Sequence, residues 1–300
     1  MSSRPPREQS NSPDENRSAS TVLVTGATDG VGRATALELA RRGATVIAHG
    51  RSDAKAQSLE SALAATGTAD YETVIADFTE LDDVRELADH VAFRYDRLDA
   101  LVNNAGAFFE SGELTAEGVE RTIAVNHLAP FVLTDRLRDR IEAANGRVVT
   151  TASAIHHRAE FAIADLETTT DYDGMDAYAR SKFANVLFTY QLAERLDRAT
   201  ANCFHPGFIP SSGLYRNASL PVRLFMAVLS ALPSVLTDRF TASAEAGAET
   251  AVYLATSGEV ADVTGQYFDG TESAESAPKT YDEALQQRLW EWSESVVADV

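Results

Sequence analysis

The stretch that decides the fold reads Thr25-Gly26-Ala27-Thr28-Asp29-Gly30-Val31-Gly32, and it stands between a short apolar run and a segment of helical composition. A strand that turns directly into a helix leaves backbone N–H groups unpaired and presents the positive end of the helix dipole. Because Gly26, Gly30 and Gly32 have no side chains, a pyrophosphate can approach these groups closely. The stretch therefore predicts a dinucleotide site, and the alternative is a glycine-rich turn that binds no ligand.

Outward from this loop, short Val- and Ile-rich runs alternate with longer amphipathic stretches. This alternation is typical of a parallel sheet covered by helices on both faces. We expect strands at 21–25, 45–49, 73–76, 100–103, 147–151, 200–204 and 265–268. No linker-like segment divides the chain, so we predict one α/β domain over residues 21–300: a three-layer, doubly wound parallel sheet (Rossmann fold) with about seven strands.

Two segments depart from the alternation. Residues 1–20 are polar and lack an apolar core, so we expect a disordered tail rather than a signal peptide. Within residues 208–240, the run 220–236 is almost wholly apolar but shorter than the roughly 20 residues that a membrane span needs. We therefore expect no membrane span, and two interpretations stay open: a buried helical hairpin, or an apolar lid over an active site.

Composition limits the partners and the compartment. The chain has 300 residues, 44% of them hydrophobic, which is enough for a sizeable core, and its formal charge of -19 argues against binding to nucleic acid or anionic lipid. A single cysteine, Cys203, cannot form an intramolecular disulfide, and we expect a cytoplasmic protein. Because positive charge is scarce and the chain has only three lysines, the balance resembles that of halophilic proteins, and we predict stability that depends on salt.

The end of the second expected strand bears on which dinucleotide is bound. An NAD site places a carboxylate there to accept from the ribose 2'-hydroxyl, but the sequence reads Ala48-His49-Gly50-Arg51. Arg51 stands beside the vacant position, and Arg33 opens the first helix. Guanidinium groups match phosphate geometry, so NADP(H) is the preferred cofactor and NAD(H) is possible; alternatively, these arginines only cover the surface.

Tyr178 and Lys182 lie four residues apart in a run of helix formers, which places both on one helical face. A tyrosine ordinarily titrates near 10, but a lysine charge about 4 Å away contributes about 4 kcal/mol at an effective dielectric of 20. This corresponds to about three pKa units before desolvation opposes it. Tyr178 could then exchange a proton with an alcohol or carbonyl oxygen near neutral pH.

Other polar residues follow the expected strands in a consistent order. Asn103-Asn104-Ala105-Gly106 ends the fourth strand, Asn126 lies in the next helix, Ser153 follows the fifth strand, and His205-Pro206-Gly207 ends the sixth. Open α/β sheets bind ligands at the edge where these strand ends meet. With the Tyr178 and Lys182 pair, the combination resembles the short-chain dehydrogenase/reductase family from Thr21 to about Val297.

The resemblance implies a role for each matching position. Tyr178 corresponds to the proton donor or acceptor, Lys182 to the residue that lowers its pKa and binds the nicotinamide ribose, and Ser153 to the serine that hydrogen-bonds the substrate oxygen. Asn126 corresponds to the asparagine that holds a water in the proton relay. The implied cofactor contacts are Gly26, Asp29, Gly30, Val31, Gly32, Arg33, Arg51, Asp77, Phe78, Asn104, Ala105, Gly106, Tyr178, Lys182, Pro206 and Gly207.

Within the family, the chain looks most like the retinol-dehydrogenase-like and WW-domain-oxidoreductase-like branch. The long interval from Ser153 to Tyr178 and the segments 154–157, 165–166, 265–268 and 289–290 carry this likeness. The family resemblance also suggests a homodimer or homotetramer. His156 and His157 have no partners at metal-ligand spacing, so we interpret both as loop histidines and expect no metal site.

Three functions remain open. The first is an NADP-dependent oxidoreductase that interconverts a hydroxyl and a carbonyl on an apolar substrate, with Tyr178 as acid/base. The second keeps the cofactor but reduces a carbon–carbon double bond, as protochlorophyllide reductases do. The third is a non-catalytic dinucleotide sensor or scaffold, which would be expected to have lost Tyr178 or Lys182, yet both are present.

Overall fold

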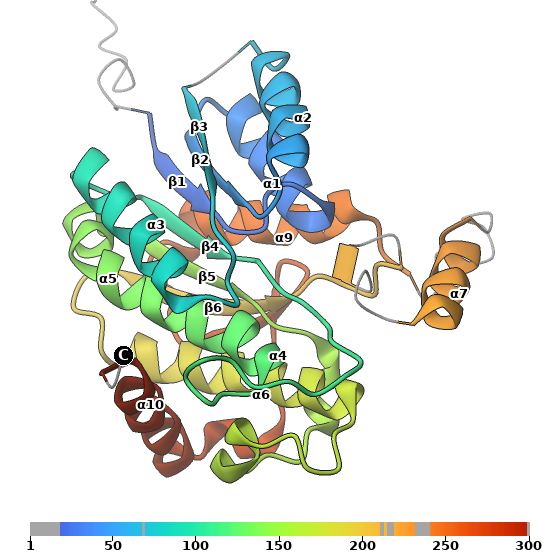
Figure 1. The fold of residues 1–300 in the computed structure, drawn as a ribbon. Coiled ribbons are helices and arrows are strands. Elements are labelled where there is room, and N and C mark those ends of the chain that lie inside the picture. Colours follow the sequence, from blue (N-terminus) through green and yellow to red (C-terminus); the bar gives the residue numbers. More distant parts are fainter. Residues whose placement is uncertain (1–18, 68–69, 211–212, 215–218, 232–240, 299–300) are drawn as a thin grey trace, which may run out of the picture.

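A computed structural model describes residues 19–67, 70–210, 213–214, 219–231 and 241–298. Within them, one eight-stranded sheet runs in the order β3-β2-β1-β4-β5-β6-β7-β8, and helices cover both of its faces (Figure 1). Neighbouring strands pair in parallel except β7 and β8, which are antiparallel. The strands are β1 (Thr21–Val24), β2 (Thr45–Gly50), β3 (Tyr71–Ile75), β4 (Ala100–Asn103), β5 (Arg147–Thr151), β6 (Thr200–His205), β7 (Gln266–Asp269) and β8 (Glu272–Ala274).

The predicted doubly wound sheet is thereby confirmed. All seven expected strands are present, and the ends of β4 and β5 agree with the expectation to the residue. The eighth strand, β8, was not predicted; it pairs Glu272 with Asp269 across a tight turn. The expected tail at 1–20 lies almost entirely outside the described residues.

The helices form two layers. The helices are α1 (Gly30–Arg41), α2 (Asp53–Ala64), α3 (Leu81–Arg94), α4 (Arg121–Ile123), α5 (Ala129–Ala144), α6 (Gly174–Ala193), α7 (Leu220–Ala231), α9 (Ala244–Thr256) and α10 (Glu283–Ala298). Successive side chains of a strand point to opposite faces, so Val22 and Val24 join a core with α1, α2 and α9, whereas Leu23 joins one with α3, α5, α6 and α10. Both faces of β1 are therefore buried, which explains its uninterrupted apolar sequence.

The C-terminal helix α10 closes the second layer. Its Trp290 ring lies 4.9 Å from the Phe131 ring of α5 and 6.0 Å from the Phe188 ring of α6. The Arg195 guanidinium covers the same indole at 4.4 Å. α10 thereby packs over both α5 and α6 (Figure 1).

The segment 208–240 is described only in part. Its helix α7 stands out from the body of the protein (Figure 1), and Leu220, Leu224 and Val228 are 73%, 63% and 55% exposed. The interpretation as a buried helical hairpin is therefore wrong for the described half, because these three apolar side chains are not buried. No helix in the described ranges combines the length and the apolar character that crossing a bilayer requires.

Candidate active site

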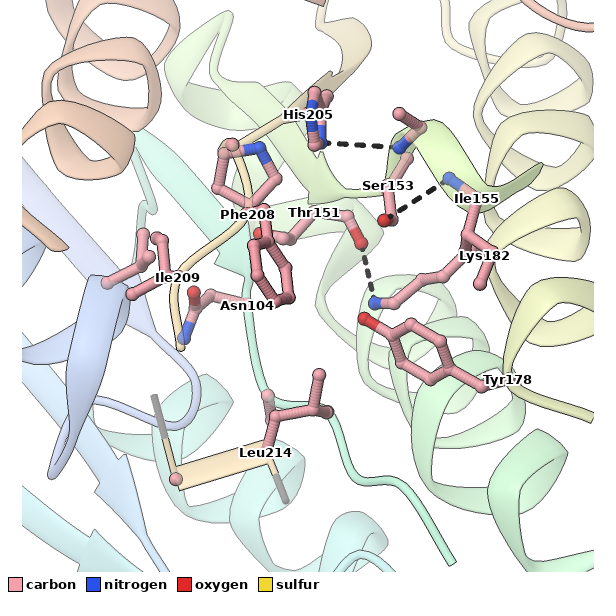
Figure 2. A pocket seen from close by; sticks show the side chains of 18 of the residues that line it. Asn104, Thr151, Ser153, Ile155, Tyr178, Lys182, His205, Phe208, Ile209 and Leu214 are labelled. Carbon is pink, nitrogen blue, oxygen red and sulfur yellow. Dashed lines mark hydrogen bonds between the residues drawn. The ribbon is translucent and has the colours of Figure 1, made fainter. Parts of the chain in front are cut away.

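A cavity of about 580 Å3 opens at the carboxyl edge of the sheet, beyond the ends of β4, β5 and β6 (Figure 2). It brings Ser153 together with Tyr178 and Lys182, although Ser153 lies 25 residues before Tyr178 in the sequence. Its other lining residues include Val31, Asn104, Ala105, Gly106, Thr151, Ala152, Ile155, Arg158, Met175, His205, Pro206, Gly207, Phe208, Ile209 and Leu214. The polar groups face a mostly apolar space, which suits the orientation of one reacting polar group on an apolar molecule.

Lys182 lies at the back of this cavity and is 3% exposed. Its ammonium donates to the Thr151 carbonyl at 2.9 Å, lies 5.7 Å from the centre of the Tyr178 ring, and sits beside the phenol oxygen (Figure 2). Burial lowers the pKa of Lys182 to about 8, so the group is still mostly charged at neutral pH. A positive charge is therefore held beside the Tyr178 hydroxyl (Figure 2).

Ser153 follows β5 and begins the short 3-10 helix Ala154–Arg158. Its hydroxyl oxygen accepts a hydrogen bond from the Ile155 N–H at 3.5 Å and faces the same cavity as the Tyr178 hydroxyl (Figure 2). Because the Ser153 hydroxyl oxygen accepts a hydrogen bond in this turn, its own hydrogen can be donated to another group. An oxygen held between Ser153 and Tyr178 could receive hydrogen bonds from both.

Asn126 is fully buried in a π-helical turn, Ala124–Leu128, which separates α4 from α5. Its amide donates to the Ala107 carbonyl at 3.0 Å and to the Ser181 hydroxyl at 2.9 Å, and its oxygen accepts from the Ala107 N–H at 2.7 Å. The side chain thus ties the loop after β4 to α6, the helix that carries Tyr178 and Lys182. It does not line the cavity, and its role as a water holder stays a prediction.

The glycine loop packs tightly against the rest of the chain. Gly26 has a φ of 64°, and a Cβ there would lie 2.9 Å from the Ala105 Cα. A Cβ on Gly32 would lie 2.4 Å from the Gly26 carbonyl oxygen. These glycines are therefore required by contacts within the protein, in addition to any close approach of an anion. The next helix, α1, is capped by Asp29, whose carboxylate accepts from the Gly30 N–H at 2.9 Å.

A second, smaller hollow of about 90 Å3 adjoins the cavity and shares Ala105, Gly106, Gly213 and Leu214 with it. It is lined by Gly26, Thr28, His49, Gly50, Arg51, Ala76, Asp77, Phe78, Ala107 and Val125. The two spaces meet beside the glycine loop, so the residues present fit a dinucleotide laid across the sheet edge, with the adenosine on this side. Asp77 and Phe78, both implied contacts, lie here.

Arg51 and Arg33, the two arginines that were expected to favour NADP, lie in different places. Arg51 lines the hollow beside Gly26, whereas Arg33 and Gly30 line a separate groove of about 600 Å3 between α1 and α9. The structure therefore does not bring Arg33 together with Arg51. Lys55, on α2, was not singled out from the sequence; its ammonium pairs with Asp29 at 2.5 Å and supplies a second cation near the glycine loop.

His49 is another residue whose importance sequence reasoning missed. It is buried, it accepts from the Gly26 N–H through Nδ1 at 3.3 Å, and its Nε2–H donates to the Ala76 carbonyl at 3.0 Å. The ring stacks on Phe78 at 4.1 Å between ring centres. Burial lowers the pKa of His49 to about 4, so the neutral ring holds the glycine loop against β3.

The interpretation of His156 as a loop histidine is also corrected. Its neighbour His157 is exposed, but His156 is fully buried because its ring packs at 5.0 Å from Tyr267 of β7 and both its nitrogens are hydrogen-bonded. Among the described residues, no group of three or more His, Cys, Asp or Glu side chains is placed to hold a metal ion.

A tyrosine and a lysine beside a glycine-rich loop, at the edge of a sheet where open α/β folds bind ligands, fit the arrangement expected of a nicotinamide-dependent oxidoreductase. Comparisons with known proteins agree. The family model for short chain dehydrogenases matches residues 20–219. The chain belongs to the short-chain dehydrogenase/reductase family, in its retinol-dehydrogenase-like branch. It is therefore an NAD(P)-dependent oxidoreductase.

Individual relatives span nearly the whole chain. Retinol dehydrogenase 14 of Mus musculus is 36% identical over 92% of this chain and 85% of the relative. A Streptomyces protein named as a daunorubicin C-13 ketoreductase is 35% identical over 93% of both. A solved structure from Beutenbergia cavernae, with bound NADP, is 31% identical over 83% of this chain and 94% of that one, with a TM-score of 0.64.

Proposed function

We propose that this protein is an NADP-dependent oxidoreductase that interconverts a hydroxyl and a carbonyl on an apolar substrate, with Tyr178 as the acid/base. The observation that carries the proposal is the Lys182 ammonium, anchored on Thr151 and held beside the Tyr178 hydroxyl in a cavity that adjoins the dinucleotide hollow. The relatives named for retinol dehydrogenase and ketoreductase activity support the same reaction class.

An apolar substrate is supported by the cavity walls. Ile155, Met175, Phe208, Ile209 and Leu214 line the space around the polar centre. Met175 and Phe208 are among the exposed large apolar side chains of the protein, so this apolar surface reaches the solvent. Burying it against a substrate contributes about 25 cal/mol per Å2. Arg158 is the charged group on the lining besides Lys182, and it belongs to the short helix that follows Ser153.

The proposed preference for NADP depends on the positive charge around the small hollow. Arg51 lines it, and Lys55 neutralises the Asp29 carboxylate that would otherwise repel a phosphate there. Each charge-assisted hydrogen bond is worth about 1.5–3 kcal/mol, which corresponds to about tenfold or more in affinity. We expect Arg51→Ala to raise KM for NADPH by about tenfold with little change for NADH. Equal effects on both cofactors would remove the NADP proposal.

The residues divide the chemistry between them. When bound, the nicotinamide supplies or accepts the hydride. In the reduction direction, Ser153 donates a hydrogen bond to the substrate oxygen while Tyr178 gives that oxygen its proton. Lys182 stabilises the phenolate that remains, and the apolar walls exclude water. In the oxidation direction, Tyr178 takes the proton from the same oxygen.

The direct test uses Tyr178→Phe, which keeps the ring and removes the acid. Purified protein is incubated with NADPH and a panel of apolar aldehydes, ketones and α,β-unsaturated ketones. Loss of general acid/base catalysis lowers kcat by about 10²–10⁴-fold. Tyr71→Phe, at a tyrosine 38% exposed on the edge strand β3, is the control and retains activity. Unchanged turnover in Tyr178→Phe would refute the mechanism, and reduction of only the carbon–carbon double bond would favour the alternative chemistry.

A further inference from the structure

The turn that carries Ser153 is held from both sides by histidines. His205, the last residue of β6, accepts a hydrogen bond through Nδ1 from the Ala154 N–H at 3.2 Å (Figure 2). His156 contacts the Ser153 carbonyl through Nδ1 at 2.6 Å. The Ser153 hydroxyl oxygen itself accepts a hydrogen bond from the Ile155 N–H. The peptide unit that joins Ser153 to Ala154 is therefore held at both ends, by His156 at its carbonyl and by His205 at its N–H.

The protonation state of His156 follows from its partners. Its Nε2 lies 3.0 Å from the Ala277 N–H, and a backbone N–H can only donate. Nε2 is thus an acceptor without a hydrogen, so the ring hydrogen is on Nδ1 and is donated to the Ser153 carbonyl. Because Ala277 is buried just after β8, His156 connects the Ser153 turn to the C-terminal part of the sheet.

We propose that His156 and His205 are positioning residues that hold the Ser153 hydroxyl in the catalytic cavity, a role that rests on the proposed function. Neither histidine needs to touch the substrate for this role. His205 fixes the N–H that follows Ser153, and His156 fixes the carbonyl of Ser153 itself. Misplacing a reacting group by about 1 Å can cost about 10²-fold in rate, so small shifts of this turn matter.

Two contacts require a ring nitrogen without a proton: His205 Nδ1 accepts from the Ala154 N–H, and His156 Nε2 accepts from the Ala277 N–H. Burial lowers the pKa of His156 to about 4 and also holds the pKa of His205 below its ordinary value. Several charged and titratable groups face the pair: His157 lowers both pKa values, His205 lowers that of His156, and Asp269 of β7 raises that of His205. The Tyr267 ring also packs against His156. These two accepting contacts are thus intact at neutral pH and are lost in acid, when a proton occupies the accepting nitrogen, whereas the His156 Nδ1–H bond to the Ser153 carbonyl does not need a bare nitrogen.

The test compares a variant that removes each contact with one that restores it. His205→Leu removes the acceptor, and His205→Asn offers an amide oxygen near the Nδ1 position. His156→Leu removes both bonds, and His156→Asn restores a donor near Nδ1. We expect kcat to fall by about 10- to 100-fold in each leucine variant and to recover largely in each asparagine variant, while Kd for NADPH stays within about twofold. His157→Asn, at the exposed neighbour, is the control.

The pH profile supplies a signature that a merely structural role would not give. As pH falls, His205 in the wild type gains a proton and stops accepting from Ala154, so kcat declines. His205→Asn accepts without titrating, so its kcat persists to lower pH, until the remaining His156 titrates. A kcat profile of His205→Asn identical to that of the wild type would overturn the role of His205.

A double-mutant cycle shows whether the histidines act through Ser153. In a Ser153→Ala background, the leucine substitutions should cause no further loss of kcat. An equal loss in both backgrounds, or a loss of NADPH binding that parallels kcat, would overturn the proposal and assign the histidines to general folding. If Ser153→Ala alone leaves kcat unchanged, the proposed function fails instead, so the two failures are distinguishable.

Discussion

Lowering the pH from 7 to 5 should destabilise this protein, because three buried histidines are neutral in the fold. Burial lowers the pKa of His49 and His156 to about 4 and that of His127 to about 3. In the unfolded chain each titrates near 6.5, so below that pH the unfolded state binds protons that the folded state does not. Each buried neutral histidine lowers the free energy of unfolding by about 1.4 kcal/mol for every pH unit below 6.5. At pH 5 the loss is about 2 kcal/mol for one histidine and about 6 kcal/mol for the three.

His127→Phe isolates one third of this effect. The His127 ring lies among Phe131, Phe188 and Trp292, with ring centres 5.9–6.4 Å away, so a phenyl ring matches its surroundings. The substitution removes the hydrogen bond to Ser293 and costs about 1 kcal/mol at pH 7. It also removes a proton-binding site of the unfolded chain, so the loss of stability between pH 7 and 5 shrinks by about 2 kcal/mol.

The measurement is urea unfolding followed by far-UV circular dichroism at pH 7 and pH 5, at one fixed salt concentration. The many carboxylates also titrate, but they contribute equally to the wild type and the variant, so the difference belongs to His127. His157→Asn, at an exposed histidine, is the control. If His127→Phe lost as much stability between pH 7 and 5 as the wild type, the reasoning from buried neutral histidines would be refuted.

Three further predictions concern the site and the charge of the chain. Lys182→Met removes a buried cation whose pKa is lowered to about 8. We therefore expect the free energy of unfolding at pH 7 to rise by about 1–3 kcal/mol while turnover is lost. Chemical denaturation that shows a less stable variant would contradict this. Gly32→Ala places a Cβ against the Gly26 carbonyl. We expect thermal unfolding to show a loss of stability of about 1–3 kcal/mol, and fluorescence titration to show a loss of NADPH binding. Normal NADPH binding would contradict the close packing of the glycine loop. With a formal charge of -19, the protein should have a higher Tm in molar salt than in dilute buffer, and equal Tm values would remove the halophilic interpretation.

The sequence predicted most of the sheet because both faces of the parallel strands are buried. Runs such as 100–103 and 147–151 are short, carry adjacent Leu or Val residues and are bounded by polar or turn residues, so their ends could be located to the residue. β8 could not be predicted in the same way. Its three residues, Glu272–Ala274, are polar or small, and only their pairing with β7 makes them a strand.

The residue types and their order along the chain predicted that Tyr178, Lys182 and Ser153 lie close together. Tyr178, Lys182 and Ser153 do line one cavity. The supporting histidines were missed, because nothing in the sequence distinguishes buried His156 from exposed His157 beside it. Arg33 was grouped with Arg51 because it opens the first helix on the same side, but the rotation along α1 turns Arg33 toward α9.

The π-helical turn at Ala124–Leu128 fixes the number of residues between α4 and α5. A π turn holds one more residue than an α-helical turn. Deleting a single residue here would let α4 run on into α5 as a regular helix, because the deletion removes the extra residue that the π turn accommodates, and it would re-aim the side chains within the turn. Asn126 would then swing away from both Ala107 and Ser181. Homologues that differ in length should therefore carry their insertions and deletions elsewhere.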